Sequence, residues 1–567
     1  MHSTGHSASS AKSKDRANCM RNIKDSMQLD IRMTQIAVLL LCSVLMLSLA
    51  SCGPAVSTND RYGESARYLS IIDDEPETMD PQCTSEYYTV PFNVFDRLVD
   101  VRSTGGEPDI VPSLAEKWRV SDDGLVYTFK LREGVRFSNG EELTSEDVGY
   151  TFARLLSYEN SCNQDLVMYI DGADELRNGE AGTLKGFKAI DELTFTIELE
   201  HPYAAFLACL ATPGASILDQ ETTEKFGSAF GSGVKNTIGT GPFIVESWEA
   251  GEQMLLRANA DSWYGAPGCR GIKMLFDSGE VSHVDKFNDG EIDILDLDFL
   301  DSDAEYFARG DIYLKNIERS TRVGISYIAF NESVKPLDDA RVRRALQLAL
   351  DRKLLLKAVT GGRGRIENGI FPYGLTGYNP KLEEIPYDPA EAKRLLEEAG
   401  CGDGFELEID CTDTTTGSQM DLLELAAYMW GEIGVDAHIR KIESDEFYEL
   451  RGEGKLSCYT GSWSADFDDP SNFIYTFFGN VQNTNGRSLC YDDKDIMKRV
   501  KMAAQIVDED ERIKEYQELE KIIVQDDAAW VPLYSRQHLF VISDRVEGFT
   551  VLWNGWSSNN YRDVKIK

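Results

Sequence analysis

The sequence predicts a mixed α/β protein built of several lobes, and two observations carry this prediction. The chain has 567 residues, which is too long for one ordinary domain. From residue 68 onward, short segments in which polar and apolar residues alternate are interspersed with longer segments in which apolar residues recur at helical spacing. A hydrophobic share of 42% supplies enough apolar side chains to build more than one core.

Strands are predicted where apolar and polar residues alternate between turn residues. The clearest case is 126–131 (VYTFKL), which is followed by Gly134 and by the turn Asn139-Gly140. The segment 193–199 (LTFTIEL) alternates in the same way. The predicted strands are 68–72, 126–131, 193–199, 405–409, 435–442, 529–534 and 539–542.

Helices are predicted where apolar residues recur every three or four positions between recognisable ends. The strongest segment is 338–359, which Gly361 follows as a C-terminal signal. Thr144 suits the N-cap position of a helix over 145–156, because acidic residues follow in the first turn. The predicted helices are 89–99, 145–156, 338–359, 389–399, 421–433 and 508–524.

The charge balance excludes nucleic acid as a partner. The chain carries 96 acidic and 58 basic residues, for a net charge of −38. Such a surface repels phosphate backbones and anionic lipid, so we read the charge first as a solubility property. The 11 cysteines contain no CxxC pair, which removes the common zinc and redox motifs. Whether any of them pair depends on the redox state of the compartment, and spacing alone leaves this open.

Motifs of catalysis and of cofactor binding are missing from the sequence. After residue 51 the histidines are His201, His283, His438 and His538, which lie far apart and form no HExxH spacing. No GxSxG elbow, Walker loop or dinucleotide-binding fingerprint is present. We therefore expect a protein that is not an enzyme and that uses no cofactor and no metal.

The N-terminus has the order of a lipoprotein signal peptide. Residues 36–49 form an uncharged apolar run, which is too short to span a bilayer comfortably but suits the core of a signal peptide. Basic residues precede the run, and it ends in Leu49-Ala50-Ser51-Cys52-Gly53, which resembles the lipobox of bacterial lipoproteins. In that motif the cysteine is acylated, so we expect Cys52 to anchor the protein without a spanning helix. The alternative is a buried helix that ends in a cysteine by chance.

Several stretches along the chain, in the same order and spacing, resemble the peptide- and nickel-binding family of ABC-importer binding proteins. Together they extend over nearly all of residues 65–567. The stretches are Thr78-Met79-Asp80-Pro81, 112–118 (PSLAEKW), 127–132 (YTFKLR), 143–148 (LTSEDV), 239–243 (GTGPF), 290–293 (GEID), 338–343 (DDARVR) and 392–396 (AKRLL) with Ala399-Gly400.

The resemblance implies an α/β fold of three hinged lobes, like that of periplasmic binding proteins. The lobes are discontinuous in sequence, and the ligand cleft lies between lobes I and III, which close over it. By this resemblance, lobe I comprises 65–99, 230–325 and 530–567, lobe II comprises 100–229, and lobe III comprises 326–529. Residues 1–51 are then a signal peptide with an N-terminal extension, and 52–64 are the lipidated cysteine and a tether.

The resemblance also implies a function and partners. The protein would capture peptides, with oligopeptides favoured by the final third of the chain, and deliver them to the permease and ATPase of an ABC importer. It would work outside the cytoplasmic membrane, in a periplasm or on the outer face of a single membrane, held by its lipid and as a monomer. Three alternatives stay open: a binder of dipeptides, nickel chelates or another small solute, a lipoprotein that senses peptides without transport, and a hydrolase.

The same resemblance indicates the residues that hold the ligand. In 462–470 (SWSADFDDP), the main chain of Ser462 and Ser464 pairs with the peptide and Trp463 forms a wall of the cavity. Asp466 is expected to accept the ligand's ammonium group. The alternative for Asp466 is a capping residue of the turn, which is the role that we assign to Asp468 and Asp469.

Three further residues are expected in the site. Arg451 aligns with a basic residue that binds the peptide carboxylate in some relatives, whereas Thr460 stands where other relatives have an arginine. The alternative for Arg451 is a solvated surface charge. Ser85 and Tyr87 fall where relatives line the ammonium pocket.

Overall fold

The computed structural model describes residues 68–103, 108–277, 279, 281–298, 307 and 316–567. They belong to one compact unit, Ser65–Lys567. The predicted signal peptide, Cys52 and the tether 52–64 lie outside the described residues. Within the described residues, no helix combines the length and the apolar character needed to cross a membrane.

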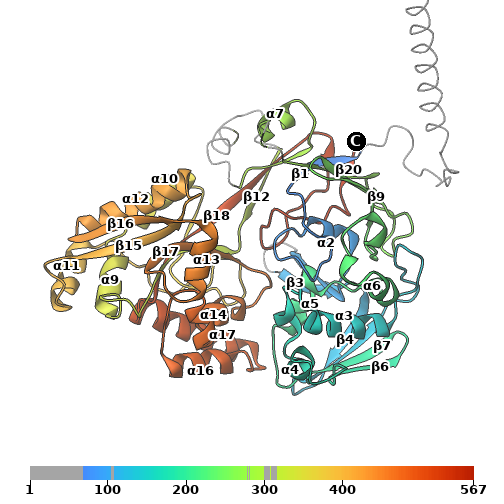
Figure 1. Cartoon of the computed structure of the whole chain (residues 1–567), viewed down its shortest axis with the longest axis horizontal. Coiled ribbons are helices and arrows are strands. Elements are labelled where there is room, and N and C mark those ends of the chain that lie inside the picture. Colours follow the sequence, from blue (N-terminus) through green and yellow to red (C-terminus); the bar gives the residue numbers. More distant parts are fainter. Residues whose placement is uncertain (1–67, 104–107, 278, 280, 299–306, 308–315) are drawn as a thin grey trace, which may run out of the picture. The chain divides into compact units, whose positions relative to one another are not determined.

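Twelve strands form one large mixed sheet (Figure 1). Its centre is β18, because four strands pair with it: β11 and β12 toward one end, β13 and β14 toward the other. The order along the sheet is β16 (Val435–Ile442), β15 (Phe405–Thr412), β17 (Cys458–Ser464), β13 (Gly324–Phe330), β18 (Trp530–Ile542), β11 (Ile294–Asp296), β1 (Leu69–Asp73), β10 (Gly271–Phe276), β9 (Gln253–Ala258) and β8 (Phe243–Glu249), and β12 (Ile317–Thr321) and β14 (Gly364–Ile366) lie off this path.

β18 corrects the prediction of two separate strands at 529–534 and 539–542. It is one strand of 13 residues, and it runs beside β12 in Figure 1. The polar residues 535–538 interrupt the apolar pattern, but their backbone is paired with β14 and β12. Their side chains also find partners: Ser535 donates to Glu367 at 2.6 Å, and His538 lies 2.5 Å from Asp296. Because buried polar groups that are hydrogen-bonded cost little, the strand continues through them.

The predicted helix over 338–359 is in fact two helices, α9 (Ala340–Leu348) and α10 (Arg352–Thr360). The chain breaks at Asp351, whose side chain accepts a hydrogen bond from the N–H of Leu354 at 3.0 Å and caps the second helix. Because the apolar pattern continues across the break, the sequence pattern did not indicate that a second helix begins here. Gly361 ends α10 in the left-handed conformation, as predicted.

The predicted helix over 89–99 is also shorter than expected, because α2 covers only Thr89–Val94. Phe95 leaves the helix in an extended conformation, and Val99 begins a strand. The intervening Asp96 is buried and accepts hydrogen bonds from Thr240 at 3.0 Å and from Trp263 at 2.8 Å. These contacts with distant residues override the local helical pattern.

Most other predicted elements are confirmed within a few residues. α3 (Ser145–Ser157) begins with a capping box between Thr144 and Asp147. Asp388 caps α11 by accepting from the N–H of Glu391 at 3.0 Å. The confirmed elements are β5 (Val126–Leu131), β7 (Thr194–Glu198), α3, α11 (Pro389–Glu398), α12 (Gly417–Gly431), α17 (Glu509–Lys521), β1, β15 and β16.

The remaining elements lie around these strands and helices. They are β2 (Val99–Ser103), β3 (Pro108–Pro112), β4 (Ala115–Val120), α4 (Ala173–Arg177), β6 (Phe187–Asp191), α5 (Phe206–Leu210), α6 (Gln220–Phe226), α7 (His283–Asn288), α13 (Ser444–Gly452), α14 (Ser471–Phe478), α15 (Val481–Asn485), α16 (Lys494–Ala503), β19 (Val546–Glu547) and β20 (Lys565–Ile566). β4, β5, β7 and β6 form a separate antiparallel sheet of four strands.

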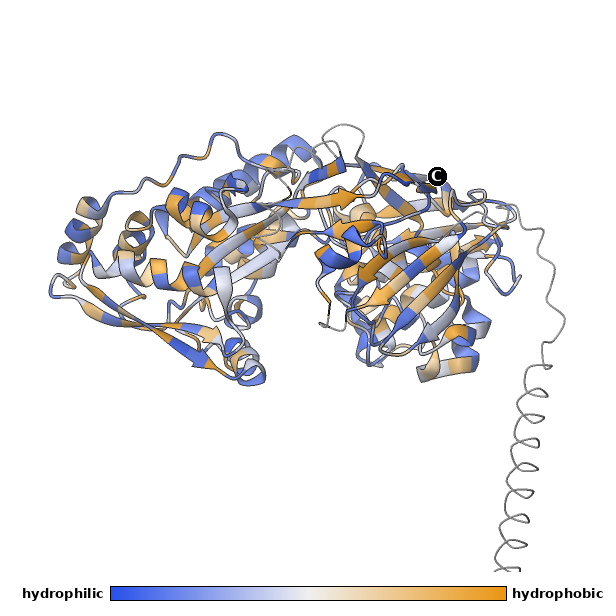
Figure 2. Ribbon diagram, turned by 90° about the horizontal axis from the view of Figure 1, so that it is seen from above, coloured by the Kyte–Doolittle hydropathy of each residue, from blue (hydrophilic) through white to orange (hydrophobic). Residues whose placement is uncertain are grey.

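The buried apolar side chains gather in distinct clusters. The largest draws on residues from Val323 to Tyr534, and a second draws on Leu98 to Ile217 together with Phe467 and Ala504. A smaller one joins two residues of β18, Leu539 and Val541, to Ile292, Leu295, Leu297, Phe307 and Ile317. In Figure 2 the hydrophobic colour runs along many of the strands. β18 contributes side chains to the largest cluster and to this smaller one, so the strand connects the two cores.

Candidate ligand-binding site

One edge of β17 is open over most of its length. The strand pairs with β13 from end to end, so that Ser462 lies opposite Ser326 and Ser464 lies opposite Gly324. On its other side β17 pairs with β15 only at Tyr459. Among the described strands, none therefore occupies this edge from Thr460 to Ser464. Such an edge offers backbone donors and acceptors to an extended peptide.

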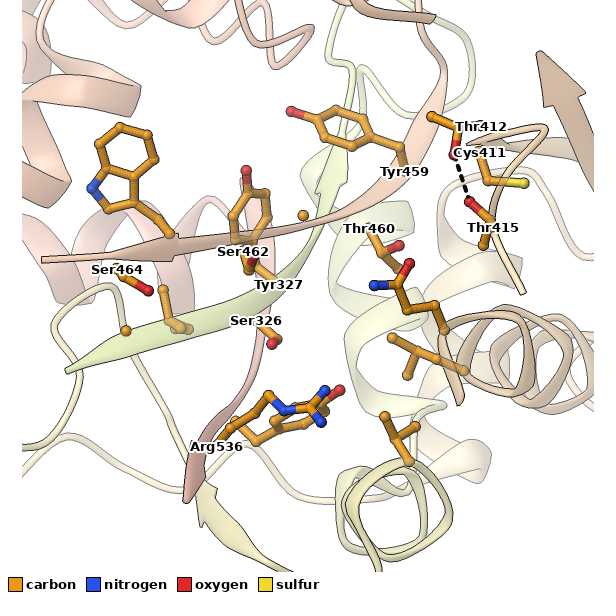
Figure 3. A pocket seen from close by; sticks show the side chains of 18 of the residues that line it. Ser326, Tyr327, Cys411, Thr412, Thr415, Tyr459, Thr460, Ser462, Ser464 and Arg536 are labelled. Atoms are coloured by element: carbon orange, nitrogen blue, oxygen red, sulfur yellow. Dashed lines mark hydrogen bonds between the residues drawn. The ribbon is translucent and has the colours of Figure 1, made fainter. Parts of the chain in front are cut away.

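A cavity of about 330 Å³ lies along β17 and β13 (Figure 3). β17 contributes Ser462, Trp463 and Ser464 to its lining, and Arg451 of α13 lines it as well. Four of the residues expected at the site are thus brought to one cavity. Further lining comes from Ser326 and Tyr327 of β13, Thr412 and Thr415 near the end of β15, and Arg536 of β18.

Trp463 is held in a fixed orientation at the cavity. Its indole N–H donates to the backbone oxygen of Asn472 at 3.1 Å, and its ring meets Phe477 edge-to-face at 5.7 Å. These contacts satisfy the polar atom of the ring and fix its plane, so the ring can serve as a rigid wall.

Gly461 allows β17 to approach the ring of Tyr327. A β-carbon at Gly461 would lie 2.5 Å from the Tyr327 hydroxyl oxygen. Tyr327 is itself buried and stacks on Trp530 at 4.5 Å, so it has no room to withdraw. Only glycine fits here without moving the cavity wall.

The cavity is cationic in a chain that is strongly acidic. Its charged lining residues are Arg322, Arg451, Arg536 and one acid, Asp410. Asp410 is already engaged, because Arg440 Nε and the Ser457 N–H donate to it at 2.7 and 2.8 Å. Arg322 likewise forms an ion pair with Asp298 at 2.6 Å, so the arginine that favours an anionic ligand group is Arg451.

Arg451 has no carboxylate partner within the described part of the chain. Its guanidinium packs over the ring of Tyr448 at 4.9 Å, and its Nε is buried without a hydrogen bond. Nearby, Arg487 packs over Trp463 at 5.4 Å and over Phe477 at 5.0 Å, also without an ion pair to any described residue. Burial lowers the pKa of Arg487, and the charge of Arg451 lowers it further. Two partly buried cations without an anion between them form a favourable place for a ligand carboxylate.

Arg487 was not predicted from the sequence. It lies in a polar loop after α15 and belongs to no motif that the sequence shows. Only its spatial position beside Trp463 marks it as a site residue. No spacing pattern could have revealed this contact.

Asp466 lies just beyond the end of β17 and lines a smaller cavity with Phe92, Thr212 and Trp556. It is not among the residues that line the larger cavity. Its N–H donates to Asn472 Oδ1 at 3.1 Å, and Asn472 Nδ2 donates to its carboxylate at 3.0 Å. Burial raises the pKa of Asp466 to about 6, although the Asn472 hydrogen bond opposes this shift. A cation placed beside this carboxylate would stabilise its ionised form.

The neighbouring aspartates hold the turn. Asp468 accepts from the N–H and the hydroxyl of Thr376, each at 2.7 Å. Asp469 accepts from the Ser471 N–H at 2.9 Å at the start of α14 and forms an ion pair with Arg512. The turn role is confirmed for Asp469, whereas the Asp468 side chain binds a distant loop at Thr376.

Ser85 and Tyr87 lie elsewhere than expected. Ser85 is exposed, and Tyr87 is half-buried with its N–H donating to Thr84 Oγ1 at 3.3 Å. Neither is among the residues that line the two cavities described above. Tyr88 is the aromatic residue near Asp466: burial raises its pKa, and the Asp466 charge raises it further. Its ring stacks on Trp556 at 5.2 Å, and no local pattern distinguishes Tyr88 from Tyr87 in making this contact.

A family model named "Bacterial extracellular solute-binding proteins, family 5 Middle" matches residues 109–485. The chain belongs to this family. Di/tripeptide-binding protein 2 of Pseudomonas aeruginosa is 30% identical over 473 residues, covering 81% of this chain and 87% of that protein. Heme-binding protein A of Haemophilus influenzae is 28% identical over 482 residues, covering 80% of this chain and 84% of that protein.

Solved structures confirm the predicted fold class. The periplasmic binding protein DppA from Helicobacter pylori, solved in complex with the peptide STSA, is 26% identical to this chain with a TM-score of 0.70, covering 88% of this chain and 97% of that one. The family consists of solute-binding proteins and not of enzymes. Within the residues that the structure describes, no cluster of three or more His, Cys, Asp and Glu side chains is placed to hold a metal ion.

Proposed function

We propose that this solute-binding protein captures peptides outside the cytoplasmic membrane and delivers them to the permease and ATPase of an ABC importer. The observation that carries the proposal is the open edge of β17 beside a cavity, because a peptide can pair with this edge whatever its sequence. The names of the relatives agree: one binds di- and tripeptides, and one was solved with a bound peptide.

In this binding mode each part of the peptide has a partner. The main chain pairs with Ser462 and Ser464, while Trp463 walls the cavity. The ammonium group goes to Asp466, whose carboxylate already has one amide donor in Asn472. The carboxylate goes to Arg451, and Arg487 adds a second positive charge behind Trp463.

The proposed lobes are I (65–99, 230–325 and 530–567), II (100–229) and III (326–529). With these bounds the chain passes from lobe I to lobe III at Ile325-Ser326, inside β13, and returns at Ala529-Trp530, where β18 begins. Two adjacent strand crossings make a hinge that bends without breaking either core. The lipid on Cys52 would hold the body at the membrane, where it meets the permease as a monomer.

A binder of dipeptides or another small solute is the second candidate. The cavity of about 330 Å³ favours it, because this volume is at the lower end for ligand sites. We include heme in the test because one relative is named a heme-binding protein. Nickel chelates are included because the sequence analysis left them open.

Isothermal titration against a series of peptides of two to six residues tests the proposal, with native mass spectrometry of the purified protein to detect retained ligand. We expect tight binding of free peptides and weaker binding when either end is blocked by acetylation or amidation. Binding of heme or Ni²⁺-histidine without binding of any peptide would refute it. Binding of dipeptides alone would select the second candidate.

A further inference from the structure

Cys83 and the loop that contains Cys162 lie side by side. The N–H of Cys162 donates to the backbone oxygen of Gln82 at 2.9 Å. The side-chain amide of Asn163 donates to the backbone oxygen of Thr84, also at 2.9 Å. These two bonds bracket Cys83, so Cys162 lies beside it on a segment that is far away in sequence. The thiols themselves donate to other groups, Cys83 to Asp80 at 3.4 Å and Cys162 to the backbone oxygen of Asn160 at 3.8 Å, so the side chains must rotate to meet.

The backbone geometry permits a disulfide bond between them. One hydrogen bond and standard covalent dimensions separate the two α-carbons, which places them at most about 7 Å apart. Disulfides in proteins span about 4.4–6.8 Å between α-carbons. Both residues are thiols in the structure, with Cys83 half-buried and Cys162 exposed. We propose that Cys83 and Cys162 form a disulfide bond when the protein is outside the cytoplasm.

The space outside the cytoplasm provides the oxidising conditions that a disulfide bond needs. Extracellular solute-binding proteins work where disulfides persist. The Cys162 thiolate attacks the disulfide of an extracytoplasmic thiol oxidase and forms a mixed disulfide. The Cys83 thiolate then displaces the oxidase, which leaves as a dithiol. The two cysteines lose two protons and two electrons, and the oxidase disulfide gains two electrons.

The surroundings of both thiols disfavour their thiolate forms. Burial raises the pKa of Cys83 to about 12, with the neighbouring Asp80 carboxylate contributing to the shift. The pKa of Cys162 is also raised, first by burial and then by Asp80. Scarce thiolates make uncatalysed exchange slow, which is why the step needs an oxidase.

The disulfide bond would link the segments of Cys83 and Cys162 covalently near Asp466. The segment from Asp80 leads directly to Tyr88, and the Cys162 loop leads to Asp165, whose charge adds to the raised pKa of Asp466. Arg154 of α3 already forms an ion pair with Asp80 of the first segment. A covalent link here would limit the freedom of the segment and would close a long loop in the unfolded chain.

Thiol mapping tests this without any ligand. The full chain is reduced, incubated in a glutathione redox buffer with protein disulfide isomerase as oxidase, alkylated and digested. We expect a disulfide-linked peptide joining Cys83 to Cys162, an intact mass lower by the two hydrogens lost, and a melting temperature several degrees above that of the reduced protein.

Three variants make the result specific. Cys83→Ser and Cys162→Ser should each abolish the linked peptide and the thermal shift, whereas the control Cys401→Ser should keep both. Full alkylation of Cys83 and Cys162 after oxidation, or a linkage of either one to another cysteine, would overturn the proposal. Since no peptide ligand enters the experiment, its failure leaves the proposed function untouched.

Discussion

Asp466 is the residue on which the proposed binding mode depends most. Its side chain is half-buried, accepts one amide hydrogen bond and has a pKa raised to about 6 by partial burial. Removing the partner of a buried charge costs more than the pair contributes, because the remaining charge stays desolvated. Asp466→Asn should therefore weaken binding of a free peptide by about 2–5 kcal/mol, roughly thirty-fold to several thousand-fold.

Acetylation of the same peptide supplies the control for this variant. An acetylated peptide has no ammonium group, so Asp466→Asn should change its affinity little. Titration calorimetry of both proteins with both peptides completes a double-mutant cycle. Losses that simply add, without a coupling energy, would show that Asp466 does not meet the ammonium.

The raised pKa of Asp466 also predicts a pH dependence of binding. The ammonium needs the ionised carboxylate, and in the free protein this group takes up a proton below about pH 6. Affinity for free peptides should be constant above that pH and fall by up to about tenfold for each pH unit below it. Titrations from pH 7.5 to 4.5 would show this, and Asp466→Asn should flatten the profile. A wild-type profile as flat as that of the variant would contradict the assignment.

Tyr88, the aromatic residue near Asp466, could not be chosen from the sequence alone. Tyr87 and Tyr88 are adjacent and chemically identical, yet only Tyr88 stacks on Trp556 at the smaller cavity. The choice depends on a contact with a residue near the C-terminus, which local sequence does not encode. The same holds for Arg487, which meets Trp463 although a turn and the two helices α14 and α15 separate them in sequence.

At the scale of elements, local periodicity predicted single strands and helices well. The alternation at 126–131 coincides with β5, and the predicted 389–399 nearly coincides with α11. Periodicity failed where one element gives way to another without a change in pattern, as at Asp351. It also failed where a strand continues through polar residues whose partners are distant, as in β18.

The pairing of β17 with β13 yields a prediction for Gly461. Its substitution by alanine places a β-carbon against the buried Tyr327 ring, and the strands must separate or the ring must move. We expect Gly461→Ala to lower the free energy of unfolding by about 1–3 kcal/mol. Peptide affinity should fall as well, because the open edge of β17 shifts. Urea unfolding and titration calorimetry measure the two effects.

Gly431 provides a matched control for Gly461. It is the last residue of α12, and a β-carbon there would meet no atom within 4 Å. Gly431→Ala should therefore change stability by less than about 0.5 kcal/mol. Equal effects of the two alanines would mean that the Tyr327 contact does not constrain β17.

At the scale of the whole molecule, His538 links stability to pH. Its two ring nitrogens lie 2.7 Å from the oxygen of Gly555 and 2.5 Å from the Asp296 carboxylate, and both partners only accept hydrogen bonds. His538 must therefore be doubly protonated and positively charged. Burial alone would lower its pKa, but the charge and hydrogen bond of Asp296, with Asp298 nearby, raise it above 6.5.

A raised histidine pKa stabilises the folded state at low pH. This contribution is complete below the unfolded pKa of about 6.5 and is lost as pH rises through the folded pKa. The difference in unfolding free energy between wild type and His538→Gln should therefore shrink from pH 6 to pH 9 in urea titrations. A difference that stays constant with pH would contradict the charged state of His538.

The order Leu49-Ala50-Ser51-Cys52 predicts the location of the whole molecule. Cys52→Ala should move the protein from the detergent phase to the aqueous phase in Triton X-114 partitioning, without changing its melting temperature. Acyl chains are the only anchor that we propose, so their loss should release the protein. Unchanged partitioning of the variant would exclude lipidation at this position.

The place of β18 in the chain sets the order in which the protein can be assembled during synthesis. β11, β12, β13 and β14 all need β18 as a neighbour, and all are made before it. Until residue 542 has left the ribosome, the large sheet lacks its middle and these four strands have unpaired edges. Domains made earlier usually fold as they emerge. Here the main sheet can be completed only when translation is nearly finished, whereas the sheet of β4, β5, β7 and β6 can form much earlier.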